Sequence, residues 1–126
     1  MGLVPHFHHV NLGVPVDGIE AQTAFLTGVL EFRTVPPPAS AAGFPLYWFG
    51  DDEGIQIHLS ADPDHRPAAQ AHVAVTIDDL DALAARLEGA GIDFTSLDIF
   101  GRRTLFCCDP AGNRWELRGD RVTERP

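Results

Sequence analysis

The sequence predicts an α+β protein built from two tandem βαβββ modules with mixed sheets. Three observations carry this prediction: an internal repeat, several short runs that alternate apolar and polar residues, and one helical stripe in each half. The repeat opens with His-Val at His9 and again at His72, 63 residues later in a chain of 126. Each copy then passes into a helical pattern and closes on an acidic residue followed by Phe. The chain therefore looks like a duplicated unit.

The first module, residues 5–60, is expected to hold one helix and four strands. Residues 8–14 alternate at period 2, which is typical of a strand with one buried face. Residues 18–30 place their apolar side chains on one side of a helix. A proline-rich loop separates two of the three strand-like runs that follow. These runs cover residues 32–35, 46–50 and 55–59.

The second module, residues 70–120, repeats this order after a linker at 61–69. A strand at 71–77 is followed by a helix that Asp78 or Asp79 can cap, and glycine is expected to end that helix at 89 and 91. A turn at 109–113, with the sequence DPAGN, joins the last two strands as a hairpin. The three strands after the helix cover 92–94 or slightly more, 103–108 and 114–118. We expect the two modules to form a single domain, 1–126.

Composition excludes several classes of protein. A net charge of −9 and a pI of about 4.8 argue against nucleic acid and anionic membrane surfaces, which both need a basic face. No apolar run is long enough to cross a membrane, and the first residues lack a signal-peptide pattern. The adjacent cysteines, Cys107 and Cys108, cannot link distant parts of the fold and suit a reducing cytosol. We therefore expect a cytoplasmic protein.

Alternation brings histidine and glutamate to the polar face of four strands. Side chains two residues apart share a face, so the face opposite the apolar residues carries one imidazole or carboxylate in each strand. These candidates are His9, His58, His72 and Glu116. Asn11 and Gln56 share the face in the first module and could contact a substrate. In the second module, Arg114 and Arg118 share it and could hold a substrate carboxylate.

Imidazole and carboxylate together are the ligand set of Zn²⁺, Fe²⁺, Mn²⁺, Co²⁺ or Ni²⁺. A single strand histidine is more often a surface or half-buried residue, but equivalent positions in two repeats favour a metal site. Open coordination positions on one divalent ion would allow catalysis. His8 has the parity of the apolar residues and is not a candidate, and His6 and His65 have no assigned role.

The chain resembles the vicinal oxygen chelate superfamily, which includes glyoxalase I, fosfomycin-resistance enzymes, bleomycin-resistance proteins and extradiol dioxygenases. The resemblance covers about residues 5–120 and rests on four segments: HVNLGV, IQIHL, AHVAVTIDDLDAL and FCCDPAGNRWEL. The last of these is similar to the family's D-P-x-G-N/H-x-x-E-L signature and is the most specific.

The resemblance implies a cup, formed by the two modules, around one divalent metal. The family pattern matches His9, His58, His72 and Glu116 as ligands, although glyoxalase I has Glu at the position of His58. A small substrate would bind the metal through two neighbouring oxygens, and Glu116 could move a proton in lyase or isomerase chemistry. Many small members are homodimers, so a homodimer is expected.

Two other functions stay open. An Fe²⁺ extradiol-type dioxygenase could use the same ligands, whereas a bleomycin-resistance-like protein would bind a small molecule without metal. Tyr47, Trp48 and Phe49 could line an aromatic groove, although their strand favours the core or a dimer interface. The chain departs from bacterial glyoxalase I, which has arginine where Gly13 stands. It departs from fosfomycin-resistance enzymes at Phe106 and at Asn11, where those enzymes have tyrosine and threonine.

Overall fold

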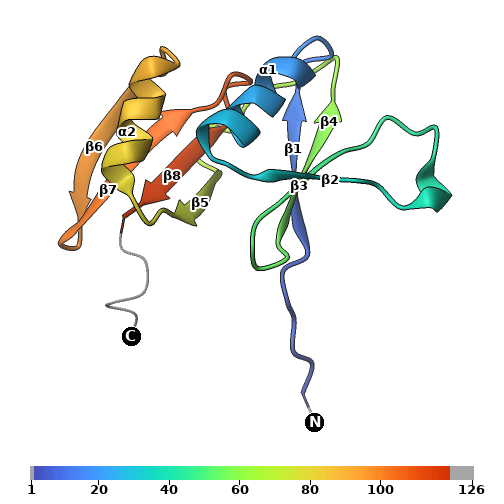
Figure 1. Cartoon of the computed structure of the whole chain (residues 1–126), viewed down its shortest axis with the longest axis horizontal. Helices are drawn as coiled ribbons and strands as arrows, with labels where there is room; N and C mark the ends of the chain where they lie inside the picture. The colour runs from blue at the N-terminus through green and yellow to red at the C-terminus, as the bar shows by residue number, and fades with distance from the viewer. Residues whose placement is uncertain (1, 120–126) are drawn as a thin grey trace. The chain divides into compact units, whose positions relative to one another are not determined.

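The computed structural model describes residues 2–119 and divides the chain into two compact units, Met1–His65 and Arg66–Pro126. Each unit contains a strand, a helix and three further strands in that order (Figure 1). The predicted α+β class and the duplicated βαβββ pattern are therefore confirmed. Each unit has its own four-stranded sheet that mixes parallel and antiparallel pairs.

In unit 1 the first strand lies beside the last. The sheet order is β1-β4-β3-β2, with β1 parallel to β4 and the other pairs antiparallel. Val14, Phe49 and Ile57 are buried in the apolar core of the unit. The elements are β1 (His9–Val14), α1 (Ile19–Ala24), a π-helical turn (Phe25–Val29), β2 (Arg33–Val35), a short 3-10 turn (Ala39–Ala41), β3 (Tyr47–Gly50) and β4 (Gln56–Ala61).

The helix predicted at 18–30 is not one regular α-helix. It changes after Ala24 into a π-helical turn, in which the amide of Leu30 donates to the carbonyl of Phe25 at 3.1 Å. The wider turn contains Gly28, which has low helix propensity, and Thr27, whose hydroxyl donates to the carbonyl of Thr23. Apolar spacing alone does not reveal this change, because the turn still buries its apolar side chains.

Unit 2 repeats the arrangement in the order β5-β8-β7-β6, with β5 parallel to β8. The helix α2 lies over one face of this sheet (Figure 1). Asp79 caps α2 by accepting from the amide of Ala82 at 3.0 Å, and Gly91, at φ 71°, follows its end, as the sequence predicts. The elements are β5 (His72–Thr76), α2 (Leu80–Gly89), β6 (Phe94–Ile99), β7 (Arg102–Cys108) and β8 (Arg114–Arg118).

A buried carboxylate shapes the turn between β7 and β8. Asp109 Oδ1 accepts from the amides of Ala111 and Asn113, at 3.0 and 2.9 Å, and Oδ2 accepts from the indole of Trp115 at 3.0 Å. Trp115 is fully buried, so this turn is tied directly to the core of unit 2. The hairpin predicted at 109–113 is thereby confirmed, and its Asp fixes the start of β8.

The described part of the chain contains no helix that is both long and apolar enough to span a membrane.

What matters for function is the pairing of first and last strands in each unit. That pairing sets β1 beside β4 and β5 beside β8, the four strands that carry the predicted ligands.

Candidate metal centre

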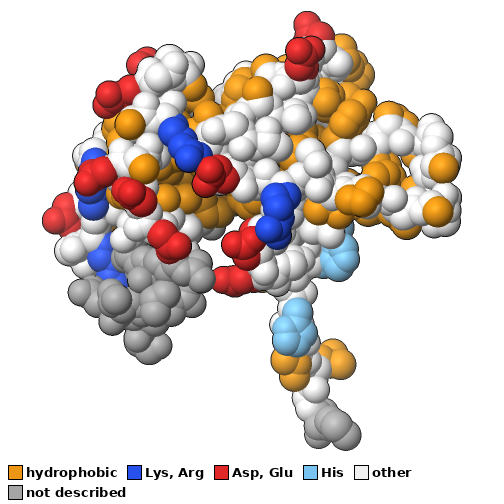
Figure 2. Space-filling model, in the orientation of Figure 1, with side chains coloured by type: hydrophobic (Ala, Val, Ile, Leu, Met, Phe, Trp, Pro, Cys, Tyr) orange, Lys and Arg blue, Asp and Glu red, His pale blue; other side chains and the backbone are white. Residues whose placement is uncertain are grey.

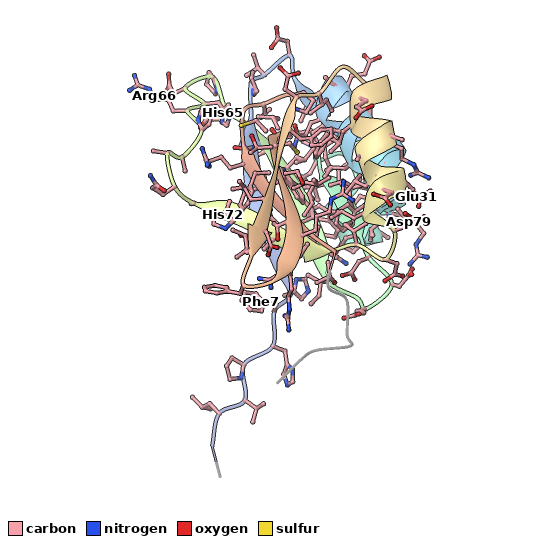
Figure 3. The ribbon with its side chains drawn as sticks, turned by 90° about the vertical axis from the view of Figure 1, so that its left-hand side faces the viewer. Phe7, Glu31, His65, Arg66, His72 and Asp79 are labelled. Carbon is pink, nitrogen blue, oxygen red and sulfur yellow. The ribbon has the colours of Figure 1, made fainter. Side chains whose placement is uncertain are left out.

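Unit 2 brings His72 and Glu116 into contact. In the parallel register, Glu116 lies opposite Ala74, one alternate position along β5 from His72, so both side chains share a face. His72 Nε2 lies 3.2 Å from Glu116 Oε1. The imidazole is about two-fifths exposed and the carboxylate is largely buried. His72 stands at the start of β5, where a ligand can reach it (Figure 3).

The hydrogen bond at Nδ1 of His72 determines the role of Nε2 in the same ring. Nδ1 lies 3.0 Å from the carbonyl oxygen of Gln70, which can only accept a hydrogen bond, so Nδ1 carries the proton. In the neutral ring, Nε2 then turns a lone pair toward the Glu116 carboxylate. Two acceptors at 3.2 Å need a cation between them, either a proton or a metal ion. A backbone carbonyl on Nδ1 is the usual outer partner of a metal-binding imidazole.

Arg118 lies beside the same carboxylate. Its Nη1 is 3.4 Å from Glu116 Oε2, so the guanidinium and the imidazole contact different oxygens of one side chain. The register also places Phe106 opposite Glu116 on the neighbouring strand β7. Arg118 is therefore positioned to orient the carboxylate, whereas Arg114, opposite His72, is exposed.

Unit 1 gathers histidines on the corresponding face. The register of β1 and β4 pairs Asn11 with His58 and His9 with Gln56, as the alternation predicts. The rings of His9 and His58 are stacked with their centroids 3.9 Å apart and their planes at 16°. Asn11 Oδ1 accepts from the hydroxyl of Ser60 at 3.0 Å, so these polar side chains form one continuous strip.

His58 is covered on both sides. Trp48, opposite it on β3, stacks against the ring at 4.5 Å and 8°, and His9 stacks at 3.9 Å. Only 8% of His58 is exposed, although it lies on the polar face. Burial lowers the pKa of His58, and the neighbouring His9 and His8 lower it further. Its Nε2 lies 2.8 Å from Gln56 Oε1, so this nitrogen reaches a metal only if the Gln56 side chain turns away.

Two unit 1 residues correct the sequence interpretation. The sequence allowed Trp48 in the core or in a dimer interface; it lies outside the core of unit 1, half-buried against His58, while Phe49 is buried in the core. Residues 46–49 are all apolar, so the sequence shows no alternation there. Only the register of β3 and β4 reveals which face of the sheet carries Trp48. His8 was assigned to the apolar side, yet its Nδ1 lies 2.9 Å from His9 Nδ1. His8 precedes β1, and strand alternation does not govern it.

His65 lies over Gly13 at the other end of the strip. It stands in the connection after β4 (Figure 3), and a Cβ added to Gly13 would come within 2.9 Å of its Nδ1. Any side chain at Gly13 would therefore displace the imidazole. An arginine at position 13, as in bacterial glyoxalase I, would therefore require His65 to move.

No group of three or more His, Cys, Asp or Glu side chains suited to a metal ion occurs among residues 2–119. Each unit instead holds one pair of candidate ligands, His9 with His58 and His72 with Glu116. In donor chemistry the pairs fit a borderline divalent ion, since they offer imidazole nitrogen and carboxylate oxygen. Histidine side chains are visible on the N-terminal segment and on the surface next to it (Figure 2).

Comparison with known proteins agrees with this fold. A crystal structure of a glyoxalase family protein from Bacillus anthracis has a TM-score of 0.82 and 24% identity, covering 94% of this chain and 97% of the other. The fosfomycin resistance protein FosX from Mesorhizobium loti has a TM-score of 0.75 and 22% identity over 98% of both chains. TnmS3, an antibiotic binding protein from Streptomyces sp. CB03234, has a TM-score of 0.71 and 20% identity, covering 94% and 98%.

No curated protein matches the chain. The model of one family matches residues 6–117, nearly the whole length. That match includes both histidine-opening repeats and the final strand with Glu116. The chain therefore belongs to the Glyoxalase/Bleomycin resistance protein/Dioxygenase superfamily, as its motifs predict.

Proposed function

We propose that the chain is a metal-dependent enzyme of lyase or isomerase type, acting on a small substrate with two neighbouring oxygens. The observation that supports it most is the facing pair of acceptors, His72 Nε2 and Glu116 Oε1, with Nδ1 of the same ring bonded to the Gln70 carbonyl. With Nδ1 bonded to a backbone carbonyl, Nε2 is the nitrogen that can bind a metal ion, and such a carbonyl is a common outer partner of metal-binding imidazoles.

In this proposal one divalent ion is held by His9, His58, His72 and Glu116. The metal would supply Lewis-acid stabilisation of negative charge on the substrate oxygens. His58 would join when the Gln56 side chain releases its Nε2. Among Zn, Ni, Fe, Co and Mn, the ligand types alone favour none.

The residues around Glu116 suit proton transfer. Its carboxylate is largely buried, and Arg118 contacts one oxygen while His72 contacts the other. When the substrate displaces it from the metal, this carboxylate can accept a proton from a substrate carbon and return it. Arg118 keeps the accepting oxygen aimed, and Asn11 and Gln56 offer hydrogen bonds to the substrate from unit 1.

Elemental analysis of untagged protein tests the proposal. Near-stoichiometric divalent metal is expected in the wild type and loss of it in His72→Ala and Glu116→Gln, while Arg114→Gln, exposed on the same strand, should keep its metal. If the wild type holds no metal and reconstitution with Zn²⁺, Ni²⁺, Fe²⁺, Co²⁺ and Mn²⁺ also fails, the proposal is wrong. Iron together with substrate-dependent oxygen uptake would favour the dioxygenase alternative instead.

A metal-free binding protein is the second candidate, and Trp48 favours it. Its indole lies on the polar face of unit 1, where an aromatic ligand could stack on it. The similarity to TnmS3 agrees with this alternative at the level of fold. Saturable ligand binding by protein that holds no metal, abolished by Trp48→Ala, would support it.

We also propose that the chain forms a homodimer in the cytoplasm. Large apolar side chains on the segment before β1 support this proposal, since burying them against a second copy would remove apolar surface from water. Leu3 is 99% exposed and Phe7 is 82% exposed, on the segment before β1. Light scattering should give twice the mass of 13.7 kDa. Both cysteines are free thiols, in agreement with a reducing compartment.

A further inference from the structure

We propose that His8 and His9 form a two-imidazole chelate, by which unit 1 binds a divalent transition metal without ligands from unit 2. This goes beyond the proposed function, in which His8 has no part. The two Nδ1 atoms lie 2.9 Å apart, and both side chains are exposed. Consecutive residues of a strand normally point to opposite sides. These two do not, because His8 lies just before β1 begins.

The separation of the nitrogens suits a common metal ion. With metal–nitrogen bonds of about 2.0–2.1 Å, two ligands at a right angle are about 2.9 Å apart, and two at a tetrahedral angle are about 3.3 Å apart. The 2.9 Å distance between His8 Nδ1 and His9 Nδ1 therefore needs almost no rearrangement. Without a proton or a metal between them, two imidazole lone pairs at that distance repel each other.

The sheet holds both residues in place. The carbonyl of His8 accepts from the amide of Gln56 at 3.1 Å, and His9 pairs with Gln56 in the register of β1 and β4. The His9 ring is further supported by its stack on His58. Since the backbone and one ring are already ordered, binding costs less side-chain entropy than at two free surface histidines.

His58 supports the chelate without joining it. Its ring is stacked parallel to that of His9 and lies edge-on to that of His8, with centroids 6.4 Å apart. Its Nε2 is directed to Gln56 Oε1. The remaining coordination positions would be filled by water. Two imidazoles with open positions suit Cu²⁺ best, because its affinity for nitrogen ligands is the highest of the divalent series.

The test uses Cu²⁺ and the full-length chain carrying His72→Ala and Glu116→Gln, which removes the pair in unit 2. Calorimetry should give one copper per chain, and electron paramagnetic resonance should show two imidazole nitrogens. His8→Ala in this background should weaken binding at least about tenfold and leave one nitrogen. His6→Ala, which removes an exposed histidine two residues earlier, should change neither, and His58→Leu, which removes only the ring stacked on His9, should keep both nitrogens.

Several results would overturn the inference. Unchanged binding in His8→Ala, equal loss in His6→Ala, or loss of a nitrogen in folded His58→Leu would each do so. Circular dichroism verifies the fold of each variant. If copper no longer binds once His72 and Glu116 are replaced, the chelate is absent although the proposed enzyme site stands. If the background still binds two-nitrogen copper while the wild type never holds a metal that requires Glu116, the enzyme proposal fails and the chelate stands.

Discussion

His72 and Glu116 face each other as two acceptors: Nε2 is 3.2 Å from Oε1, and the ring's only proton in its neutral form is directed to the carbonyl of Gln70. Parallel pairing of β5 and β8 produces this contact between residues far apart in the sequence. The contact is complete only with a positive charge between the two atoms. A proton or a divalent metal ion can supply that charge, and the metal content of the protein tells the two apart.

Glu116→Gln should remove metal and preserve the fold. The amide can donate to His72 Nε2, so the contact survives without its negative charge. We expect affinity for Zn²⁺ to fall by more than the roughly 10- to 100-fold typical of an outer-shell partner. Calorimetric titration measures it, with Arg114→Gln as the control. Equal affinity in wild type and Glu116→Gln would remove the carboxylate from the ligand set.

Trp48→Ala should destabilise the chain by about 1.5–3 kcal/mol, because it removes a large side chain that is stacked on His58. Urea unfolding followed by circular dichroism gives the free energy. Phe44→Ala is the matched control, since Phe44 is 68% exposed and should cost less than about 0.5 kcal/mol. Similar losses in both variants would mean that the stack contributes no stability.

Asp109→Ala should lower the free energy of unfolding more than Trp48→Ala does. It removes three hydrogen bonds to a buried carboxylate and leaves the indole of Trp115 and two amides without their acceptor. We expect a loss of about 3 kcal/mol or more in the free energy of unfolding. Asp98→Ala, at an exposed position on β6, should be nearly neutral. A loss below about 1 kcal/mol for Asp109→Ala would contradict this account of the turn.

The two neighbouring cysteines should react very differently. Burial raises the pKa of Cys107 to about 12, with smaller contributions from Cys108 and Asp109. A raised pKa keeps the thiol protonated and unreactive at pH 8, whereas the Cys108 thiol is exposed. Iodoacetamide at pH 8 should therefore modify the Cys108 thiol quickly. Mass spectrometry counts the modified thiols over time. Cys108→Ser should abolish the fast reaction, and rapid modification of that variant would show that Cys107 is accessible.

Alternation in the sequence predicts which strand residues share a face, and the structure agrees for both parallel pairs. His9, Asn11 and His58 fall on one face of unit 1 because period 2 is a property of the extended backbone itself. The same argument holds for His72 and Glu116 in unit 2. Capping by Asp79 was also predictable, because the acceptor and the helix start are neighbours in the chain.

Other features depend on information that a single segment lacks. The face of Trp48 follows only from its pairing with His58 in the register of β3 and β4. His8 lies beside His9 because β1 begins one residue later than the alternation predicts. The proton position on His72 depends on the carbonyl of Gln70, and a sequence pattern does not specify a backbone oxygen.

The pairing of first and last strands also sets when each pair of candidate ligands can form during folding. His72 and Glu116 meet only after the loop from position 72 to position 116 has closed, and His9 and His58 only after the loop from 9 to 58. Closing such loops is slow and costs entropy before any contact repays it. Bound metal would therefore act late: it would lengthen the lifetime of the folded chain by slowing unfolding and leave the rate of folding nearly unchanged.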